Sequence, residues 1–354
     1  MRTLEWEPSA KTLKMIDQRD LPSKFAHIHL STYHEVAESI RNMAVRGAPA
    51  IGVAAAYGMV LAAEKSDAKS TDNLRQDLQS AAMILGSSRP TAVNLPWALN
   101  RMLLIAKGNF VQVDSLKKAL LEEANQMADE DVETNLAISR NGAELIEDGD
   151  TIIHHCNTGA LATVDWGTAL GVIRMAHEQG KRIHVLVDET RPRLQGARLT
   201  AWELQQYGIP FDLISDNAAG YFLRSGEANK VFFGADRVAG NGDVANKIGS
   251  YMLALAAHAN QVPVYSVFPT STVDLALENG DQIPIEERSQ DEVLELKIHD
   301  QLAAPKGASA RNPAFDITPH ELITGLVTEA EVVYPPFDKK LPIIVRNQMA
   351  VRRK

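Results

Sequence analysis

The residues best suited to chemistry follow apolar runs in the second half of the chain. Cys156 comes directly after the run at 151–155, and the turn at 157–160 follows it. A thiol acts as a nucleophile or base only as the thiolate, which backbone amides of such a turn could favour. Asp236 follows the apolar run at 231–235. A carboxyl group partly removed from water there would have a raised pKa and could serve as a general acid.

Each of these residues also has a plainer explanation. Free cysteine is among the most often buried residues, so Cys156 could be inert in the core. Asp236 could cap a helix or pair with Arg237. His154 and Cys156 share one face of a strand beside His155, which would suit a metal, but no third or fourth ligand recurs at a suitable spacing. Histidines that pack in the strand are therefore favoured over a metal site.

Three predicted helix starts place a cation beside free backbone amides, an arrangement that binds phosphate. They are Arg46-Gly47-Ala48 before the small-residue helix at 50–64, Arg89 within Ser88-Arg89-Pro90-Thr91, and Asn246-Lys247 after the turn at 240–243. Surface helix starts commonly look like this, and the glycine and alanine face of the first helix could simply permit close packing. Only convergence of all three on one cleft would make them a phosphate site.

A short loop runs from Asp188 to Gln195 and Arg198 and carries three arginines and two acids. Loops between a strand and a helix often bind ligands, although ion pairing within this loop is the alternative. The GxGxxG dinucleotide fingerprint and the GxxxxGK[ST] phosphate loop are both missing from the sequence. An ordinary nucleotide-dependent enzyme is therefore disfavoured.

The elements that must position these residues follow two patterns. Short alternating stretches at 12–16 and 25–30 predict small antiparallel strands. Apolar residues at three- and four-residue spacing then predict helices, which cover 33–43, 50–64, 74–85, 93–106 and 115–146. The first third of the chain is thus expected to be a mostly helical subdomain with a small antiparallel sheet.

From residue 151 onward, apolar runs alternate with helical segments in the rhythm of βαβ units. The runs lie at 151–155, 183–187, 211–215, 230–233 and 262–267, and the helices at 167–179, 197–207 and 247–259. The fold class is therefore α/β, with a Rossmann-like, doubly wound parallel sheet after the helical subdomain. Ligands of such sheets bind beyond the carboxyl ends of the strands. We expect an N-terminal domain at 1–128, a connecting helix at 129–147 and a catalytic domain at 148–354.

Composition narrows the class of protein further. A chain of 354 residues favours two domains. The net charge of −9, without a block of Lys or Arg, argues against nucleic acid or an anionic membrane as a partner. The N-terminus lacks the apolar core of a signal peptide, and no run approaches the roughly 18 residues of a membrane span. One cysteine permits no internal disulfide, so a cytoplasmic location is the simplest expectation.

Taken together, these segments resemble the methylthioribose-1-phosphate isomerases of methionine salvage, which are related in fold to regulatory subunits of the translation-initiation exchange factor 2B. The resemblance runs nearly end to end. Its seven blocks are VRGAPAIGVAAAYG (45–58), SRPTAVNLPWAL (88–99), HCNTGALAT (155–163), DETRPRLQGARLTAWEL (188–204), GADRVAGNGDVANKIGSY (234–251), IPIEER (283–288) and NPAFDITP (312–319).

The resemblance implies a set of site residues and an activity. Cys156 and Asp236 would be the catalytic pair. The substrate would be held by Arg46, Gly47, Ala48, Arg89, Gln195, Asn246 and Lys247. Family members convert a cyclic aldose 1-phosphate to the open-chain ketose 1-phosphate, as homodimers and without a metal or organic cofactor. Here Asp236 would donate a proton to the ring oxygen, and Cys156 would handle the hydrogen at C2.

Two alternatives stay open at this point. Related enzymes accept 5-deoxyribose 1-phosphate, and isomerases of ribose 1,5-bisphosphate share the wider fold, so the group at C5 is undetermined. A non-catalytic regulatory subunit of the translation factor would keep the same fold. Such a subunit has no reason to keep Cys156, Asp236, Gln195 and the Asn246-Lys247 pair together, which favours the enzyme.

Overall fold

The computed structural model describes residues 1–89 and 94–351, and they divide into two compact units. The first unit contains Met1–Asn135 and Gly159–Gly167, and the second contains Leu136–Thr158 and the chain from Thr168 onward. The division falls inside the long helix α5 (Val113–Ala143). The domain limits at 1–128, 129–147 and 148–354 stay a prediction.

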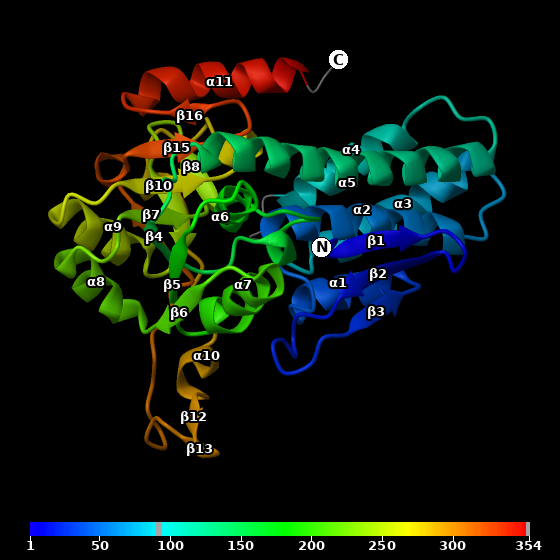
Figure 1. Ribbon diagram of the computed structural model, residues 1–354. Coiled ribbons are helices and arrows are strands. Elements are labelled where there is room, and N and C mark those ends of the chain that lie inside the picture. The colour runs from blue at the N-terminus through cyan, green and yellow to red at the C-terminus, as the bar shows by residue number, and fades with distance from the viewer. Residues whose placement is uncertain (90–93, 352–354) are drawn as a thin grey trace. The chain divides into compact units, whose positions relative to one another are not determined.

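The first unit is mostly helical, with one small sheet (Figure 1). Its antiparallel strands lie in the order β1-β2-β3 and are β1 (Leu4–Glu7), β2 (Thr12–Ile16) and β3 (His27–Leu30). Its helices are α1 (Tyr33–Arg41), α2 (Ala48–Lys65), α3 (Thr71–Gly86), α4 (Asn94–Ala106) and most of α5. The prediction of a helical subdomain with a small antiparallel sheet is confirmed, and β1 is an addition to it.

Helix α2 is the core of this unit because its small and apolar residues are buried on every side from Ala50 to Ala63. The helix starts two residues earlier than predicted, since Pro49 fits the first turn, where a helix needs no N–H group. Gly47 precedes it with φ +90°, and a Cβ there would lie 2.2 Å from the carbonyl oxygen of Ala162. Only glycine fits this position.

The second unit is built on a seven-stranded sheet in the order β16-β15-β10-β7-β4-β5-β6, parallel except for its edge strand β16. The strands are β4 (Thr151–His154), β5 (His184–Asp188), β6 (Phe211–Ile214), β7 (Lys230–Phe233), β10 (Val264–Val267), β15 (Gly325–Val327) and β16 (Val332–Val333). From β4 the chain builds outward through β5 and β6, then returns to β7 on the other side of β4. The carboxyl ends of β4 and β7 therefore flank the topological switch point, where ligands of such sheets bind.

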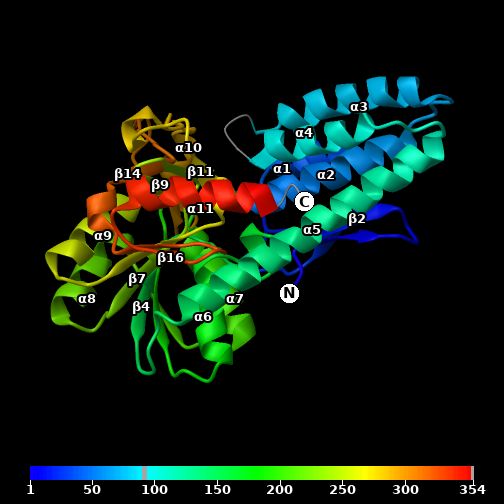
Figure 2. The ribbon, with the colours of Figure 1, turned by 90° about the horizontal axis from the view of Figure 1, so that it is seen from above.

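Helices cover both faces of this sheet, as a doubly wound fold requires (Figure 2). One face packs on the end of α5, on α6 (Ala169–Glu178) and on α7 (Ala201–Tyr207), with Ile152 among its core residues. The other packs on α8 (Ala219–Ser225), α9 (Ser250–Ala259) and α11 (Phe337–Val351), with Ile153 among its core residues. Successive strand residues thus serve opposite faces. The prediction of a Rossmann-like, doubly wound sheet is confirmed.

A second, four-stranded sheet lies in the order β11-β8-β9-β14. Its strands are β8 (Arg237–Ala239), β9 (Val244–Lys247), β11 (Val273–Asp274) and β14 (Phe315–Thr318), and the short elements α10 (Asp291–Leu294), β12 (Lys297–Ile298) and β13 (Gln301–Leu302) lie between β11 and β14. The predicted helix at 247–259 begins too early, because β9 pairs antiparallel with β14 as far as Lys247, and also with β8 at its first two residues. None of the helices described combines the length and apolar composition that a membrane crossing needs.

His154 at the end of β4 is a fully buried imidazole, with Nε2 2.9 Å from the hydroxyl oxygen of Thr158. Burial lowers the pKa of His154 to about 3, and repulsion from His155 adds to this effect. The ring is therefore neutral in the folded protein at every physiological pH. It packs at the end of the strand, hydrogen-bonded to Thr158.

Replacing His154 with glutamine should flatten the dependence of folding stability on pH. The unfolded imidazole takes up a proton below its ordinary pKa of about 6.5, whereas the folded one stays neutral to about 3. Wild-type stability therefore falls as the pH drops between these values, with a contribution of about 1.4 kcal/mol per pH unit that glutamine lacks. Urea unfolding at several pH values measures the slope. The exposed His258→Gln is the control, and an unchanged slope in His154→Gln would contradict the account.

Candidate active site

Cys156 is the second residue after the end of β4, at the switch point of the sheet, and its backbone is left-handed with φ +69°. Two threonine hydroxyls hold that backbone. Its N–H donates to Thr190 Oγ1 at 2.9 Å, and its carbonyl oxygen accepts from Thr200 Oγ1 at 2.7 Å. A left-handed conformation costs a side-chain-bearing residue about 1–2 kcal/mol, so these bonds maintain a geometry that the chain alone disfavours. The residue is buried but not sealed, with 7% of its surface exposed.

Thr190 is itself strained, since its φ of +62° is rare for a β-branched residue. Its hydroxyl donates to the carbonyl oxygen of Asp188 at 3.0 Å, and its N–H donates to Asp216 Oδ1 at 2.6 Å. Two strained residues on neighbouring strand ends are thus bonded to each other. Backbone strain of this kind concentrates at functional sites, where the surroundings over-determine it.

The cysteine and the turn that follows it are both held by residues at the start of α7. Asn157 is buried, and its Nδ2 donates to Thr200 Oγ1 at 3.1 Å and to Glu203 Oε1 at 2.8 Å. Thr200 thus contacts both residues, and it closes the single π-helical turn at Gly196–Thr200 before α7. Such turns are frequent at functional sites. Polarisation of the thiol by the turn amides stays a prediction.

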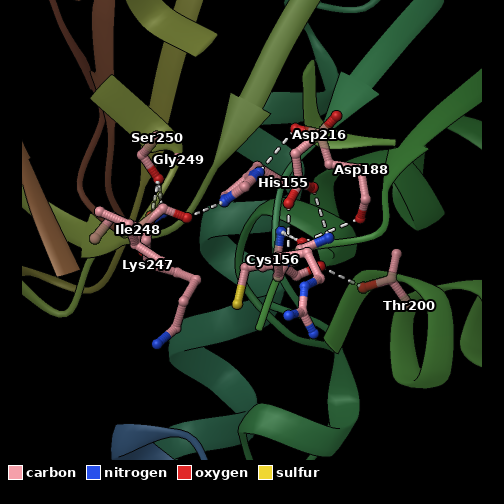
Figure 3. Close-up of polar contacts among 12 residues, drawn as sticks. His155, Cys156, Asp188, Thr200, Asp216, Lys247, Ile248, Gly249 and Ser250 are labelled. Atoms are coloured by element: carbon pink, nitrogen blue, oxygen red, sulfur yellow. Dashed lines mark hydrogen bonds and ion pairs between the residues drawn. The ribbon is translucent and has the colours of Figure 1, made fainter. Parts of the chain in front are cut away.

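His155 connects the cysteine strand to two other segments (Figure 3). Its Nδ1 lies 2.7 Å from Asp188 Oδ2, and its Nε2 lies 2.9 Å from the carbonyl oxygen of Ile248. Burial opposes the charged ring, but the hydrogen bond and charge of Asp188 outweigh it and raise the pKa of His155. For Asp188 burial acts in the opposite direction and raises the pKa of the carboxyl to about 6, although the hydrogen bond and charge of His155 lower it. The pair therefore keeps its shared proton into the neutral pH range.

Asn246 and Lys247 lie on β9 and are buried, so the hypothesis that they open a helix is wrong. Helix α9 starts at Ser250, and the carboxylate of Asp316 already accepts from the N–H groups of Gly249 and Tyr251 at 2.7 and 3.2 Å. Those amides are not available to a phosphate. What remains for an anion is the ammonium group itself.

The Lys247 ammonium donates to the carbonyl oxygen of Ala314 at 2.7 Å and lies 4.7 Å from the centre of the Phe315 ring. In Figure 3 this ammonium and the sulfur of Cys156 point to the same side of the strand ends, away from the pair of His155 and Asp188. Asn246 Nδ2 donates to Ser250 Oγ at 2.8 Å. The structure thus brings a thiol and a buried cation to one side of the sheet edge.

Asp236 lies between β7 and β8, so it follows the other strand of the switch point. Its N–H donates to the carbonyl oxygen of Ala245 at 2.8 Å, which fixes the backbone against β9. The side chain is exposed, in contrast to the expected carboxylate partly removed from water, because the turn lies beyond the end of the sheet. Arg237 Nη1 lies 3.8 Å from Asp274 Oδ2.

Gln195 stands at the start of the π-helical turn and is 7% exposed. Its Oε1 has no hydrogen-bond partner among the residues that the structure describes. A buried oxygen of this kind costs about 1–3 kcal/mol while unpaired, so a donor on a ligand would be favourable. Gly196 is required beside it, because a Cβ there would lie 1.7 Å from the carbonyl oxygen of Asp188.

The remaining predicted site residues belong to the first unit. Arg46 and Arg89 are half-buried, and Gly47 and Ala48 form the start of α2, where Gly47 offers no side-chain cap. Pro90 and Thr91, named with Arg89 as a helix start, lie outside the described residues. The part of Arg46, Gly47, Ala48 and Arg89 in binding substrate stays a prediction.

Two clusters in the described chain have a composition that could suit a metal: His155 with Asp188 and Asp216, and Asp243 with His320 and Glu321. In the first, both ring nitrogens of His155 already have partners. In the second, Asp243 accepts from backbone N–H groups of Gly280 and His320. In both clusters, polar atoms that could bind a metal already form hydrogen bonds.

Sequence reasoning missed the supporting residues of this site. Thr190 and Thr200 stand inside the block at 188–204, but nothing in their spacing indicates that they bond Cys156. His155 was visible, yet its partner Ile248 is 93 residues away. The only available signal was the run of polar residues after each strand.

The switch-point location, the strained cysteine and the buried lysine together define a Rossmann-like α/β protein with a ligand site at its strand ends. The model of the Initiation factor 2 subunit family matches residues 44–335. A curated relative from Pseudothermotoga lettingae, named methylthioribose-1-phosphate isomerase 2, is 53% identical over 96% of this chain and 97% of its own.

Solved structures agree with this assignment. That of a 5-methylthioribose 1-phosphate isomerase from Pyrococcus horikoshii has a TM-score of 0.91 and 44% identity over 98% of this chain and 96% of its own. That of a protein from A. fulgidus described as translation initiation factor eIF-2B, subunit delta, has a TM-score of 0.88 and 43% identity over 98% and 99%. The chain therefore belongs to the Initiation factor 2 subunit family and, within it, to the methylthioribose-1-phosphate isomerases.

The threonine support of Cys156 can be tested by stability. Thr190→Val keeps the shape but leaves the Cys156 N–H and Asp188 carbonyl groups without their partner, which should cost about 1–3 kcal/mol of unfolding free energy. Thr190→Ser keeps the hydroxyl and should cost less. Denaturant unfolding measures both.

Thr318 provides a matched control, because it is fully buried in the same unit and its hydroxyl has no partner within the described chain. Thr318→Val should therefore be neutral or stabilising. Equal losses in Thr190→Val and Thr318→Val would show that the Cys156 bond contributes nothing.

Proposed function

We propose that this chain isomerises 5-methylthioribose 1-phosphate to 5-methylthioribulose 1-phosphate, in methionine salvage. The observation that carries the proposal is the identity of 53% over nearly the whole length to a relative named for this activity. The local geometry is compatible with it, since a thiol and a carboxylate follow the strands that flank the switch point, and a buried ammonium lies at the end of β9.

The chemistry of the substrate explains why both an acid and a base are needed. The anomeric oxygen carries the phosphate, so the ring cannot open to a free aldehyde. In one route Cys156 as thiolate removes the proton from C2, the C1–ring oxygen bond breaks, and Asp236 protonates the ring oxygen. Reprotonation of the enol phosphate at C1 then gives the ketose. In the other route, Asp236 protonates the ring oxygen as the C1–ring oxygen bond breaks, and hydride moves from C2 to C1 of the oxocarbenium ion that results. The C2 hydroxyl then loses its proton to give the ketone.

The substrate-binding roles proposed here are those that the resemblance to the isomerase family implies. Lys247 supplies a cation, and Gln195 supplies a buried oxygen, without a partner in the described part of the chain, that can accept from a sugar hydroxyl. We assign the phosphate and the rest of the sugar to Arg46, Gly47, Ala48, Arg89 and Asn246. No cofactor enters this scheme, because hydrogen only moves between two carbons of one molecule.

Turnover of three substrates by one preparation tests the assignment. We expect methylthioribose 1-phosphate to be used in preference to 5-deoxyribose 1-phosphate and ribose 1,5-bisphosphate. Cys156→Ser and Asp236→Asn should each lower kcat at least about a hundredfold, while exposed Asp281→Asn changes nothing. A preference for the bisphosphate would overturn the substrate, and near-normal turnover by folded Cys156→Ser would overturn the role of the thiol.

A regulatory subunit without catalysis is the second candidate, since the A. fulgidus protein with 43% identity is described as a translation initiation factor subunit. The same turnover assay separates the two. Absence of turnover on all three sugar phosphates would favour the regulatory subunit.

We also propose that the protein acts as a homodimer in the cytoplasm. Helices α8 and α9 pack together and expose Tyr221, Tyr251, Met252 and Leu255. Apolar side chains gathered in this way favour a protein interface. Met252→Lys should therefore shift the mass measured by light scattering from dimer to monomer. Met83→Lys, equally exposed but on α3, should not, and a monomeric wild type would contradict the proposal.

A further inference from the structure

His155 forms a bridge between two segments that the proposed chemistry needs together. It directly precedes Cys156, and its ring reaches Asp188 at the end of β5 and the Ile248 carbonyl oxygen after β9. Ile248 in turn directly follows Lys247. One buried ring thus joins the strand end that carries the thiol to the segment that carries the ammonium.

The segment after Lys247, at residues 248–249, packs closely against the His155 ring. Gly249 has φ +105°, and a Cβ there would lie 2.8 Å from His155 Cε1. The Gly249 N–H is fixed by Asp316 at 2.7 Å, and the Ile248 N–H donates to the Ala314 carbonyl oxygen at 3.1 Å. The segment after Lys247 therefore has one position against the ring, held from both sides.

The bond to Ile248 also determines where the protons lie. A carbonyl oxygen only accepts, so His155 Nε2 carries a hydrogen, and Nδ1 shares another with the Asp188 carboxylate. Carboxylates of Asp188 on β5, Asp216 beyond β6 and Asp316 on β14 face the ring and favour its charged form. A side chain that donates only once could not make both bonds.

We propose that His155 is a positioning residue for the isomerase reaction: by donating to Asp188 and to Ile248, it holds Cys156 and Lys247 in register with each other. This inference rests on the proposed function. His155 itself does not touch the substrate. Its loss separates the two segments without removing either reacting group.

Two substitutions at His155 test its hydrogen bonds to Asp188 and to Ile248 separately. Asparagine can reach Asp188 but not Ile248, whereas the longer glutamine can reach Ile248. We expect His155→Asn to raise KM about tenfold or more, and His155→Gln to recover much of that loss. A purely structural role would lower the active fraction, and with it kcat, and leave KM unchanged. A KM within about twofold of wild type in His155→Asn would overturn the proposal.

His184→Asn is the matched control, because His184 also pairs with an aspartate, Asp212, at 2.9 Å on the same sheet but at the solvent-accessible surface. A second test leaves His155 intact. Gly249→Ala should push this residue away from the His155 ring and raise KM in the same way. Gly226 is also at positive φ but has open space around it, so Gly226→Ala should leave KM unchanged.

Hydrogen exchange tests the bridge without relying on turnover. Peptides covering 155–158 and 248–251 should lose protection together in His155→Asn and in Gly249→Ala. Loss in only one of the two segments would overturn the bridge. If wild type fails to turn over methylthioribose 1-phosphate, the proposed function falls, while the paired exchange still reports on the bridge.

Discussion

The left-handed backbone of Cys156 is the constraint on which the site depends. An extended residue there would carry β4 onward and direct the side chain onto one face of the sheet. The turn at φ +69° instead ends the strand at the switch point, and hydroxyls of Thr190 and Thr200 hold its N–H and carbonyl groups. Because each hydroxyl comes from a different segment, the position of the thiol follows from the packing of β4, the loop after β5 and the start of α7.

Burial fixes the positions of the polar groups around this site, but it also requires each of them to be hydrogen-bonded. His155, Asp188, Asn157, Glu203 and Lys247 are all buried polar groups close to one strand end. Such groups are stable inside a protein only when hydrogen-bonded, and a partly satisfied network is worse than an apolar core. Removal of one member therefore disturbs its neighbours, which is how residues that touch no substrate affect the reaction.

Periodicity and residue type were sufficient for the main architecture, because a long buried helix such as α2 and a parallel strand such as β4 carry strong local signals. Cys156 could be chosen because it follows an apolar run. Lys247 was placed wrongly on a helix, since the pairing of β9 with β14 joins residues about 70 positions apart and leaves no local trace. The same holds for the cap that Asp316 places on α9, and for the exposure of Asp236, which depends on where the sheet ends.

Protection of the thiol by substrate tests the central claim most directly, since Cys156 is the only cysteine of the chain. The rate at which methyl methanethiosulfonate modifies it would be measured at increasing concentrations of methylthioribose 1-phosphate. If Cys156 acts on the sugar, modification should stop at saturation, with half-protection at the KM of the reaction. Modification at an unchanged rate under saturating substrate would contradict the account.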